Sequence, residues 1–418
     1  MKAIIPLLIV LILSSCNKKV TTGSSSDSSS AQPENTTPLP EPTQQDIAKL
    51  VNGNNRFAFE LFSAIRTPKE NTVVSPYSIS SALAMTFAGS RNNTEKQMST
   101  VLHFRDDQDI FHNEFKTLAG DIRGLNKQDG IELSIANSLW AQRDFKFRDE
   151  FFSLVKKEYN AGLEYLDFAK DADKCRNTIN QWVEEQTKQR IKELLIPGAV
   201  DASTKLVLTN AIYFYGSWLK AFNESETFET EFYTSADGSV KAPFMKIKEE
   251  FGYFENEKYK AIELPYSGEK ISMVIILPSG KDDIEHFSRG LNTDLYNTTL
   301  PSLIKKKVDV IIPKFKITSS FDLEDYLKKM GMEDAFTGAA DFSGMTGKKD
   351  LQIDKVVHKA FIEVNEKGTE AAASTAVTMR KSSAAMLPVF RADHPFLYFV
   401  KDNKTGSILF MGQVMNPK

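Results

Sequence analysis

The sequence predicts an α+β fold. Helical patterns dominate its first half, strand patterns dominate its second half, and no internal repeat or second linker divides it. Its 418 residues are 41% hydrophobic and 26% charged, which is enough apolar content for a large core. Length alone favours two or three domains, but no linker interrupts the patterned region. We therefore expect one domain over residues 45–418.

Helices are expected where apolar residues recur at helical spacing or cover most faces of a segment. These segments are Ile47–Ile65, Ser81–Gly89, Cys175–Leu194 and Phe321–Lys329. Alternating or β-branched runs predict strands instead. Those runs are Ile131–Trp140, Lys205–Tyr215, Ala261–Tyr266, Ile271–Leu277, Val308–Ile312, Lys355–Val364, Pro395–Val400 and Ser407–Val414.

The first residues form a targeting segment. Lys2 precedes an apolar run, Ile4–Leu13, that is too short to span a bilayer, and small residues then lead to Cys16. The ending Leu13–Cys16 resembles a bacterial lipobox. We therefore expect residues 1–15 to be a lipoprotein signal peptide and Cys16 to be lipidated. An ordinary secretory signal that leaves Cys16 free is the alternative.

Residues 16–44 are rich in Ser, Thr and Pro, and this composition predicts a disordered tether. We expect the protein to be exported and anchored by lipid to a bacterial outer membrane or cell surface. The alternative is an extracellular protein. After lipidation of Cys16 only Cys175 remains, so no internal disulfide is expected and Cys175 is interpreted as a buried thiol.

The sequence contains no recognisable catalytic, metal or cofactor site. The net charge of −3 gives no reason to expect nucleic acid as a partner, and the basic run Lys305–Lys307 is interpreted as a solvated face. The five histidines are scattered, with no pair at ligand spacing. Phosphate loops, dinucleotide fingerprints and nucleophile elbows are absent. We therefore expect no metal, no cofactor and no enzyme activity.

Residues 363–383 resemble a loop in composition but alternate like a strand. A charged turn around Gly368 leads into very small residues and then to the basic pair Arg380–Lys381. Alanine would also permit a helix there. By strand parity, one face is small and then apolar, formed by Thr369, Ala371, Ala373, Thr375, Val377 and Met379. The other face is mostly polar, formed by Glu370, Ala372, Ser374, Ala376, Thr378 and Arg380.

Ten motifs in order resemble the serpin family over essentially the whole expected domain. They are Asn71–Ile79, Ala136–Trp140, Ile179–Val183, Leu208–Trp218, Pro313–Phe315, Ala340–Gly344, Val357–Ala360, Glu366–Ala373, Phe390–Leu397 and Phe410–Gly412. Any one could occur by chance, but their number and order are specific to this family. The targeting segment and the tether lie outside the resemblance.

The resemblance implies a serpin fold with a large central, mostly antiparallel β-sheet, additional sheets, N-terminal helices and an exposed reactive-centre loop at about residues 366–390. It implies a monomeric suicide-substrate inhibitor of serine proteases, and of some cysteine proteases. In this family a protease cuts the loop and forms an acyl-enzyme. The freed arm then inserts as a new central strand and drags the protease to the far pole, where its active site is crushed.

The resemblance also assigns roles to single residues. The hinge of the loop comprises Glu366, Gly368, Thr369, Glu370, Ala371, Ala372 and Ala373. Opening of the sheet is controlled by Ser75, Ser78, Asn210, Trp218, Lys314 and His358. Within this set, Lys314 and Glu366 match a pair that closes the upper opening of the sheet.

The position of the reactive bond is open by about two residues. Counting forward from Glu366 gives Ser382 before the cut, whereas counting back from the motif at Phe390 gives about Ala384. Side-chain chemistry favours Lys381–Ser382 for a trypsin-like protease, whose specificity pocket is acidic. Arg380–Lys381 would suit the same class. Met379–Arg380 would suit chymotrypsin- or subtilisin-like proteases, and Ala384–Ala385 elastase-like ones.

Two other functions remain as alternatives. One is a non-inhibitory serpin-fold protein that acts only as a substrate or as a surface binding lipoprotein. A bulky or charged residue on the inward face of the hinge would favour it, and the sequence has none there. The other is a surface binding lipoprotein or a cell-envelope enzyme outside this family. Its only support is the expected lipid anchor.

Overall fold

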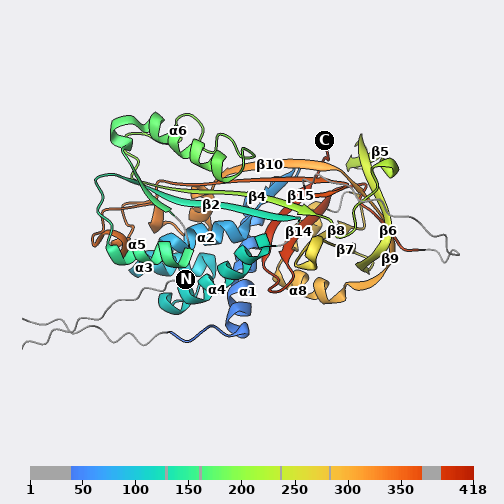
Figure 1. Cartoon of the computed structure of the whole chain (residues 1–418), viewed down its shortest axis with the longest axis horizontal. Coiled ribbons are helices and arrows are strands. Elements are labelled where there is room, and N and C mark those ends of the chain that lie inside the picture. Colours follow the sequence, from blue (N-terminus) through green and yellow to red (C-terminus); the bar gives the residue numbers. More distant parts are fainter. Residues whose placement is uncertain (1–38, 128–129, 160–161, 236–237, 282–283, 370–386) are drawn as a thin grey trace, which may run out of the picture. The chain divides into compact units, whose positions relative to one another are not determined.

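The computed structural model describes residues 39–127, 130–159, 162–235, 238–281, 284–369 and 387–418 (Figure 1). The expected signal peptide, Cys16, nearly all of the expected tether and most of the expected loop, residues 370–386, lie outside these ranges. The predictions made for them stay predictions.

Helices occupy much of the first half of the chain, and further, shorter helices lie in its second half. They are α1 (Gln44–Ile65), α2 (Pro76–Phe87), α3 (Asn92–Leu102), α4 (Gln108–Gly124), α5 (Asp149–Leu154), α6 (Phe168–Gln186), α7 (Ile284–Arg289), α8 (Thr293–Ser302), α9 (Glu324–Met330) and α10 (Ser343–Thr346). Short helical turns are η1 (Leu125–Lys127), η2 (Val155–Tyr159), η3 (Glu224–Glu226), η4 (Ser267–Glu269) and η5 (Asp334–Phe336). None of the helices in the described ranges is long and apolar enough to cross a membrane.

Strands dominate the second half, as the sequence predicts. They are β1 (Thr72–Val74), β2 (Ile131–Gln142), β3 (Gly162–Leu166), β4 (Leu206–Ser217), β5 (Phe228–Ser235), β6 (Gly238–Glu255), β7 (Tyr259–Pro265), β8 (Ile271–Pro278), β9 (Ile304–Pro313), β10 (Phe315–Asp322), β11 (Lys355–Asn365), β12 (Gly368–Thr369), β13 (Val389–Arg391), β14 (Phe396–Asp402) and β15 (Ile408–Val414).

The described strands form two sheets. A nine-stranded sheet has the order β1-β15-β14-β8-β7-β6-β9-β13, with β5 paired to β6. A six-stranded sheet has the order β10-β11-β12-β4-β2-β3, and β11 also pairs directly with β4. Most neighbours are antiparallel, but β4 pairs with β11 in parallel. The predicted α+β class with a large, mostly antiparallel sheet is therefore confirmed.

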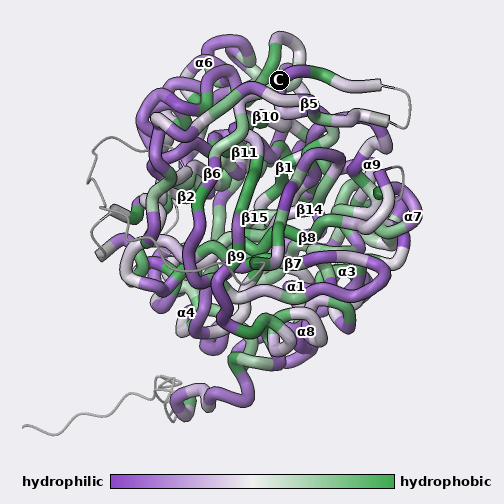
Figure 2. Tube along the Cα trace, turned by 90° about the vertical axis from the view of Figure 1, so that its right-hand side faces the viewer, coloured by the Kyte–Doolittle hydropathy of each residue, from purple (hydrophilic) through white to green (hydrophobic). Residues whose placement is uncertain are grey.

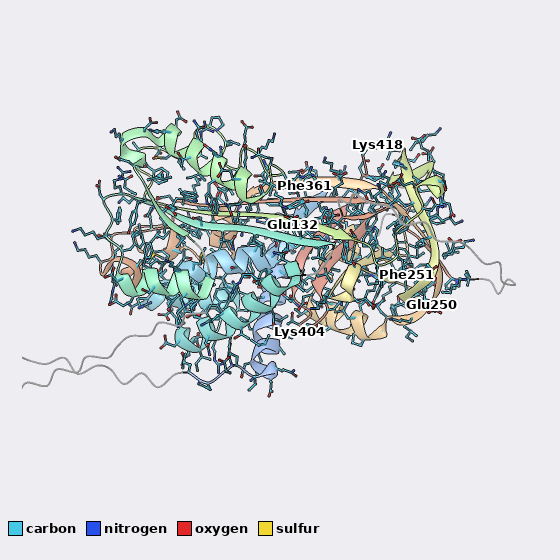
Figure 3. The ribbon with its side chains drawn as sticks, in the orientation of Figure 1. Glu132, Glu250, Phe251, Phe361, Lys404 and Lys418 are labelled. Atoms are coloured by element: carbon cyan, nitrogen blue, oxygen red, sulfur yellow. The ribbon has the colours of Figure 1, made fainter. Side chains whose placement is uncertain are left out.

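The six-stranded sheet lies between α6 on one face and α2 on the other (Figure 1). Alternate residues of its strands belong to two different apolar clusters, as period-2 side-chain alternation requires. Leu208 and Ile362, for example, face the main core, whereas Val207 and Phe361 face α6. Figure 3 shows Phe361 on the α6 side, and Figure 2 shows apolar β11 and β15 inside the fold.

The first helix starts where its sequence supplies a cap. Thr43 and Asp46 form a capping box, in which each side chain satisfies a free backbone N–H of the other residue. Helix α1 therefore begins at Gln44, one residue before the expected domain boundary. Its apolar face is buried in the core through residues such as Phe57 and Leu61.

Several predicted helix boundaries are wrong. Helix α2 begins at Pro76, before the expected Ser81, and α6 begins at Phe168, before the expected Cys175. Helix α6 ends at Gln186 although apolar spacing continues to Leu194, because Lys188 and Gln189 adopt positive φ angles that end a right-handed helix. The predicted helix at Phe321 starts later, at Glu324, because Phe321 pairs with His358 as part of β10.

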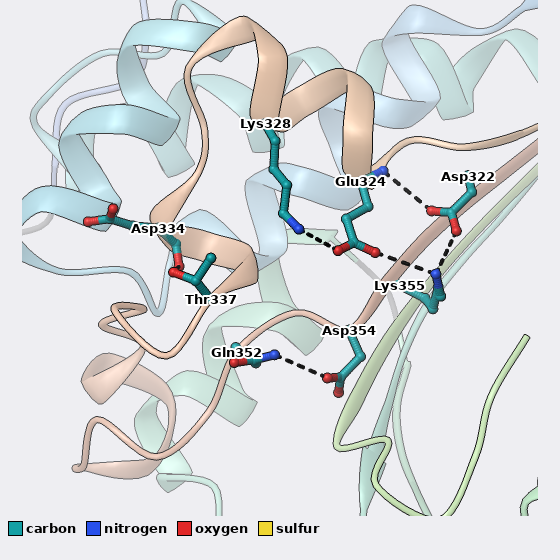
Figure 4. Close-up of polar contacts among 8 residues, drawn as sticks. All are labelled: Asp322, Glu324, Lys328, Asp334, Thr337, Gln352, Asp354 and Lys355. Atoms are coloured by element: carbon teal, nitrogen blue, oxygen red, sulfur yellow. Dashed lines mark hydrogen bonds and ion pairs between the residues drawn. The ribbon is translucent and has the colours of Figure 1, made fainter.

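The parallel pair β4–β11 is fastened at the end where both strands begin. Asp354 accepts hydrogen bonds from the backbone N–H groups of Lys205 and Leu206, at 2.6 and 2.9 Å. Lys355 pairs with Asp322 at 2.8 Å and with Glu324 at 3.4 Å (Figure 4). These contacts join β4, β10, β11 and α9, so this end of the sheet is the closed end.

Replacing Gly412 by alanine is expected to destabilise the nine-stranded sheet. A Cβ atom there would lie 2.1 Å from the backbone oxygen of Thr72 and 2.4 Å from the Tyr398 hydroxyl. Overpacking of this kind costs about 1–3 kcal/mol, and thermal melting should show a lower Tm. The matched control is Gly120→Ala, at an exposed position of helix α4 with open space around it, which should not lower the Tm. Equal melting of the two variants would contradict the prediction.

Candidate functional site

The hinge segment enters the six-stranded sheet between β11 and β4. Gly368 lies opposite Asn365 of β11 and Ser217 of β4. Thr369 lies opposite Val364 and Gly216 in the same way. This short strand, β12, is antiparallel to both neighbours and wedges between two strands that pair with each other further along. We call the junction of β4 and β11 the seam.

Glycine is required at position 368 for two reasons. Its φ angle of 151° lies where side chains are disfavoured. In addition, a Cβ atom would lie 2.0 Å from the backbone oxygen of Gly216. The hinge therefore approaches β4 more closely than any other residue would allow.

Thr369 is held by an aromatic pair at the open end of the seam. Its hydroxyl is 2.7 Å from the Tyr266 hydroxyl, and both residues are fully buried. Trp218 stacks on Tyr266, with ring centroids 4.5 Å apart. The Trp218 indole N–H donates to the Asn365 carbonyl at 3.0 Å, and its backbone N–H donates to Lys367. The two aromatic residues thus fix both the turn and the inserted hinge.

Glu366 connects the hinge to residues just outside strands β5, β9 and β10. Its carboxylate pairs with Lys314 at 3.0 Å and accepts a hydrogen bond from Thr227 at 2.7 Å. Burial raises the pKa of Glu366, but the hydrogen bond from Thr227 and the Lys314 ammonium outweigh burial, so the pKa lies below its ordinary value. Its backbone carbonyl also accepts from the Phe222 N–H at 2.8 Å. These contacts hold the open end of the seam.

A row of polar side chains, which we call the polar row, crosses the middle of the sheet; Asn210 and His358 are buried, and Asn137 is half-buried. It consists of Asn137 on β2, Asn210 on β4 and His358 on β11, at one level of the register. The Asn210 amide donates to Asn137 and, at 2.5 Å, to Ser78 of α2. Ser75 caps α2, and its hydroxyl donates to the Leu409 carbonyl at 2.5 Å. The row thereby ties the sheet to α2.

His358 provides the hydrogen bond that spans the seam. The Ser75 backbone N–H can only donate, so His358 Nε2 accepts it, at 3.2 Å. Burial lowers the pKa of His358 to about 3, which keeps the ring neutral. The remaining proton is therefore on Nδ1, which donates to the Asn210 side-chain oxygen. This bond joins β11 to β4 at the centre of the sheet.

The seam is covered on its other face by α6 and the segment that follows it. Ile191, Leu194 and Leu195 pack with Val357 and Phe361 of the sheet. Lys359 of β11 reaches up to this segment and donates to the Lys192 carbonyl at 2.7 Å. The cover includes Glu193, which has a φ angle of 47°. A strand that enters the seam must displace this packing.

Comparisons with known proteins identify the family of this chain. Residues 52–417 match the family of serpins, described as serine protease inhibitors. Human leukocyte elastase inhibitor is 42% identical over 384 residues, covering 88% of this chain and 100% of its own length. A serpin-like protein of Thermococcus kodakarensis is 39% identical over 385 residues, covering 90% of this chain and 89% of its own. The chain belongs to the serpin family.

Solved structures agree with this serpin assignment. A highly specific serpin of the insect Tenebrio molitor has a TM-score of 0.79 and 32% identity, with 90% of this chain and 99% of its own covered. Human thyroxine-binding globulin complexed with thyroxine has a TM-score of 0.81 and 29% identity, with 89% and 99% covered. The predicted fold is thus confirmed.

The structure brings together the predicted sheet-control residues of this serpin in two groups. Trp218 and Lys314 lie at the open end with Glu366, Gly368 and Thr369, as described above. The other four, Ser75, Ser78, Asn210 and His358, contact one another where the start of α2 meets the polar row. The remaining hinge and reactive-bond residues lie outside the described ranges, namely Glu370, Ala371, Ala372, Ala373, Met379, Arg380, Lys381, Ser382 and Ala384.

Sequence reasoning missed four residues of the site: Asn137, Thr227, Tyr266 and Lys359. Asn137 is inside the motif Ala136–Trp140, and its even spacing from buried strand residues is the only signal it offers. Tyr266 is the last residue of a predicted strand and could not be assigned to the hinge, because its partner Thr369 is 103 positions away.

The Glu366 contacts predict a pH-dependent contribution to stability. Because the pKa of Glu366 is lowered in the folded serpin, its contribution is present above the ordinary glutamate pKa near 4.5 and is lost as pH falls through the lowered value. Glu366→Gln should therefore lower the Tm at pH 7 by about 1–2 °C, since solvent screens the 37% exposed Lys314. The difference should shrink as pH falls below about 4.5 and should vanish once pH lies below the lowered pKa of Glu366.

Glu363→Gln is the matched control for this experiment. Glu363 lies near the end of β11, three residues before Glu366, and pairs with Lys316 at 3.3 Å, but both side chains are more exposed. Its replacement should change the Tm little at any pH. If Glu366→Gln melts like the native serpin at pH 7, or if the difference persists in acid, the pair does not hold the open end of the seam.

Proposed function

We propose that this serpin inhibits serine proteases as a suicide substrate, with insertion of its cut loop into the seam as a new central strand. The hinge pairing carries the proposal. Gly368 and Thr369 already occupy the first two positions between β11 and β4. The residues that follow in sequence, Ala371–Thr375, are small enough to continue between the two strands.

Strand pairing supplies the driving force. In the seam β4 and β11 pair with each other, whereas an inserted strand would pair with both. Each backbone hydrogen bond contributes about 0.5–1.5 kcal/mol net. Ten or more additional bonds along these strands therefore amount to at least several kcal/mol in favour of insertion. The protease performs the bond cleavage with its own residues, and the serpin contributes the strand and the sheet that receives it.

Lys381–Ser382 is the proposed reactive bond, with a trypsin-like protease as the target. A lysine side chain matches the acidic specificity pocket of that class. Arg380 would serve the same class one residue earlier, and Met379 would serve subtilisin- or chymotrypsin-like proteases. Ala384 would serve an elastase-like protease, and this choice is supported by the relatives named leukocyte elastase inhibitor. Inhibition of cysteine proteases through the same loop is part of the proposal.

A binding role without inhibition is the second candidate. It is supported by the similarity to thyroxine-binding globulin, a serpin-fold structure in complex with thyroxine. Against it stands the hinge, whose inward residues are small throughout. A strand with such residues meets no steric barrier in the sheet, so inhibition has the stronger support.

We further infer that this serpin is exported and anchored to a bacterial membrane through lipid on Cys16, and acts as a monomer. The support is the sequence Leu13–Cys16 and the Ser- and Pro-rich tether after it. Expression in a Gram-negative host with labelled palmitate tests this. The native chain should take up label and sediment with membranes, and Cys16→Ser should do neither. An unlabelled native chain would refute the anchor.

Gel electrophoresis of the full chain mixed with trypsin and with elastase tests inhibition. We expect a covalent complex that survives boiling in detergent, and mass spectrometry of the released C-terminal peptide identifies the bond. Ala373→Glu should abolish the complex while the loop is still cut, because the carboxylate would have to enter the apolar core between β4 and β11. Clean cleavage of the native chain with active protease would refute inhibition.

Ala385→Glu is the matched control. It introduces the same charge into the same loop, but after the proposed bond, where the residue stays with the released fragment. This variant should still form the complex with trypsin. If both variants fail equally, the charge acts on protease docking and the experiment gives no support for insertion.

A further inference from the structure

Strand β9 begins with a free edge that carries three consecutive lysines. Its neighbour β13 pairs with β9 only from Asp309 to Ile311. Residues 304–308 therefore have β6 on one side and no described strand on the other. Residues 304–307, with the sequence Ile-Lys-Lys-Lys, are all exposed, as predicted for the lysines. We call these four residues the basic edge.

The lysines of the basic edge differ from their neighbours on the same strands. Lys246 and Lys248 of β6 both pair with Asp309 of β9, at 3.5 and 3.4 Å. Among the described residues, in contrast, no carboxylate lies within ion-pair distance of Lys305 or Lys307. Two ammonium groups of the basic edge are therefore available to an anionic partner.

The facing strand β6 offsets this charge only in part. Glu250 lies opposite Lys307 in the ladder, but the two side chains form no ion pair. Figure 3 shows Glu250 beside Phe251, the residue opposite Lys306. The Lys306 ammonium lies over the Tyr253 ring, 4.7 Å from its centroid, and adds a third positive charge.

An exposed isoleucine begins the basic edge. Ile304 is 68% exposed, more than any other large apolar residue in the described ranges. Lysines on a free edge also prevent unwanted strand pairing, but that role does not require an exposed isoleucine. At a membrane surface, apolar side chains enter the headgroup boundary while lysines contact anionic lipids. A soluble polyanion would bind the lysines and leave Ile304 in water, so the combination favours a membrane.

The basic edge lies on the side of the domain where the expected tether ends. Helix α8 leads directly into β9, and it contacts α1 where the Asn297 amide donates to Asn52 at 3.4 Å. Figure 1 shows α1, α8 and the start of β9 along the lower side of the domain, and α6 on the upper side. A membrane on the lower side would therefore face both the basic edge and the start of α1.

We propose that the basic edge docks this serpin on an anionic lipid surface, with Ile304 in the headgroup boundary and the lysines on lipid phosphates. The contact is shallow, because the free backbone groups of the edge cannot enter hydrocarbon without partners. Strand β9 runs from Ile304 to Lys314 at the open end of the seam, about 33 Å away at about 3.3 Å per residue. Docking by one end of β9 thus leaves the open end of the seam accessible to soluble proteases.

Vesicle flotation of residues 17–418 tests docking. This chain lacks the expected signal peptide and Cys16 but keeps the whole compact unit Glu41–Lys418. It should bind vesicles of equal parts phosphatidylglycerol and phosphatidylcholine, and not pure phosphatidylcholine. The double variant Lys305→Gln, Lys307→Gln should bind at least about tenfold more weakly, because each lysine adds attraction to an anionic surface. Ile304→Ser should bind at least about threefold more weakly, because it removes the apolar contact.

The double variant Lys170→Gln, Lys174→Gln is the matched control. It removes the same charge from exposed positions of α6, on the upper side of the domain in Figure 1, and should bind like the native chain. All variants should keep the native Tm. Docking is refuted if the native chain does not bind the anionic vesicles, or if the control loses as much as the variant of the basic edge. Ile304→Ser that binds like the native chain would refute it as well, because lysines alone would then form a site for any polyanion.

The inference rests on the proposed membrane location for its biological setting, but its test does not depend on the lipid anchor. Residues 17–418 cannot be lipidated at Cys16, so vesicle binding reports on the basic edge alone. Labelling with palmitate reports on the anchor alone. A failure of one proposal is therefore distinguishable from a failure of the other.

Discussion

The parallel pairing of β4 with β11 is the contact on which the rest of the site depends. Parallel ladders are slightly less stable per residue than antiparallel ones, and here the two strands come from segments about 150 residues apart. Asp354 and Lys355 fasten the pair at one end, while Gly368 and Thr369 separate it at the other. Because the pair is fastened at one end and separated at the other, it can open only from the hinge toward the fastened end.

The polar row explains why so weak a pair stays closed. An apolar seam would resist separation only through packing, whereas here separation leaves the His358 N–H and the Asn210 oxygen without partners in the core. That penalty is local to one level, because the levels above and below are apolar. A strand that enters between β4 and β11 therefore meets its main energetic barrier at this one level. Ser75 and Ser78 connect this barrier to the position of α2 beneath the sheet.

Much of the site could be predicted from sequence, and the rest depends on register. Strand patterns located β4 and β11 to within a few residues, and the family resemblance assigned the hinge. No pattern shows that Asn137 and Asn210 share a level, or that Tyr266 bonds Thr369, because these pairs are set by strand register over long separations. The end of α6 was missed because Lys188 and Gln189 take positive φ angles, which their residue types do not predict.

Chain length explains why cleavage should precede full insertion. Beyond the C-terminal end of the loop, β13 pairs with β9. Strand β9 is followed directly by Lys314, which pairs with Glu366 at the open end of the seam. Filling the seam from Thr369 to Met379 takes the chain down by about 33 Å at about 3.3 Å per residue. The chain from Met379 to Val389 has ten Cα–Cα steps and could span at most about 36 Å on the way back. An uncut loop would have to be almost fully extended, or β13 would have to leave β9, and cleavage removes this constraint.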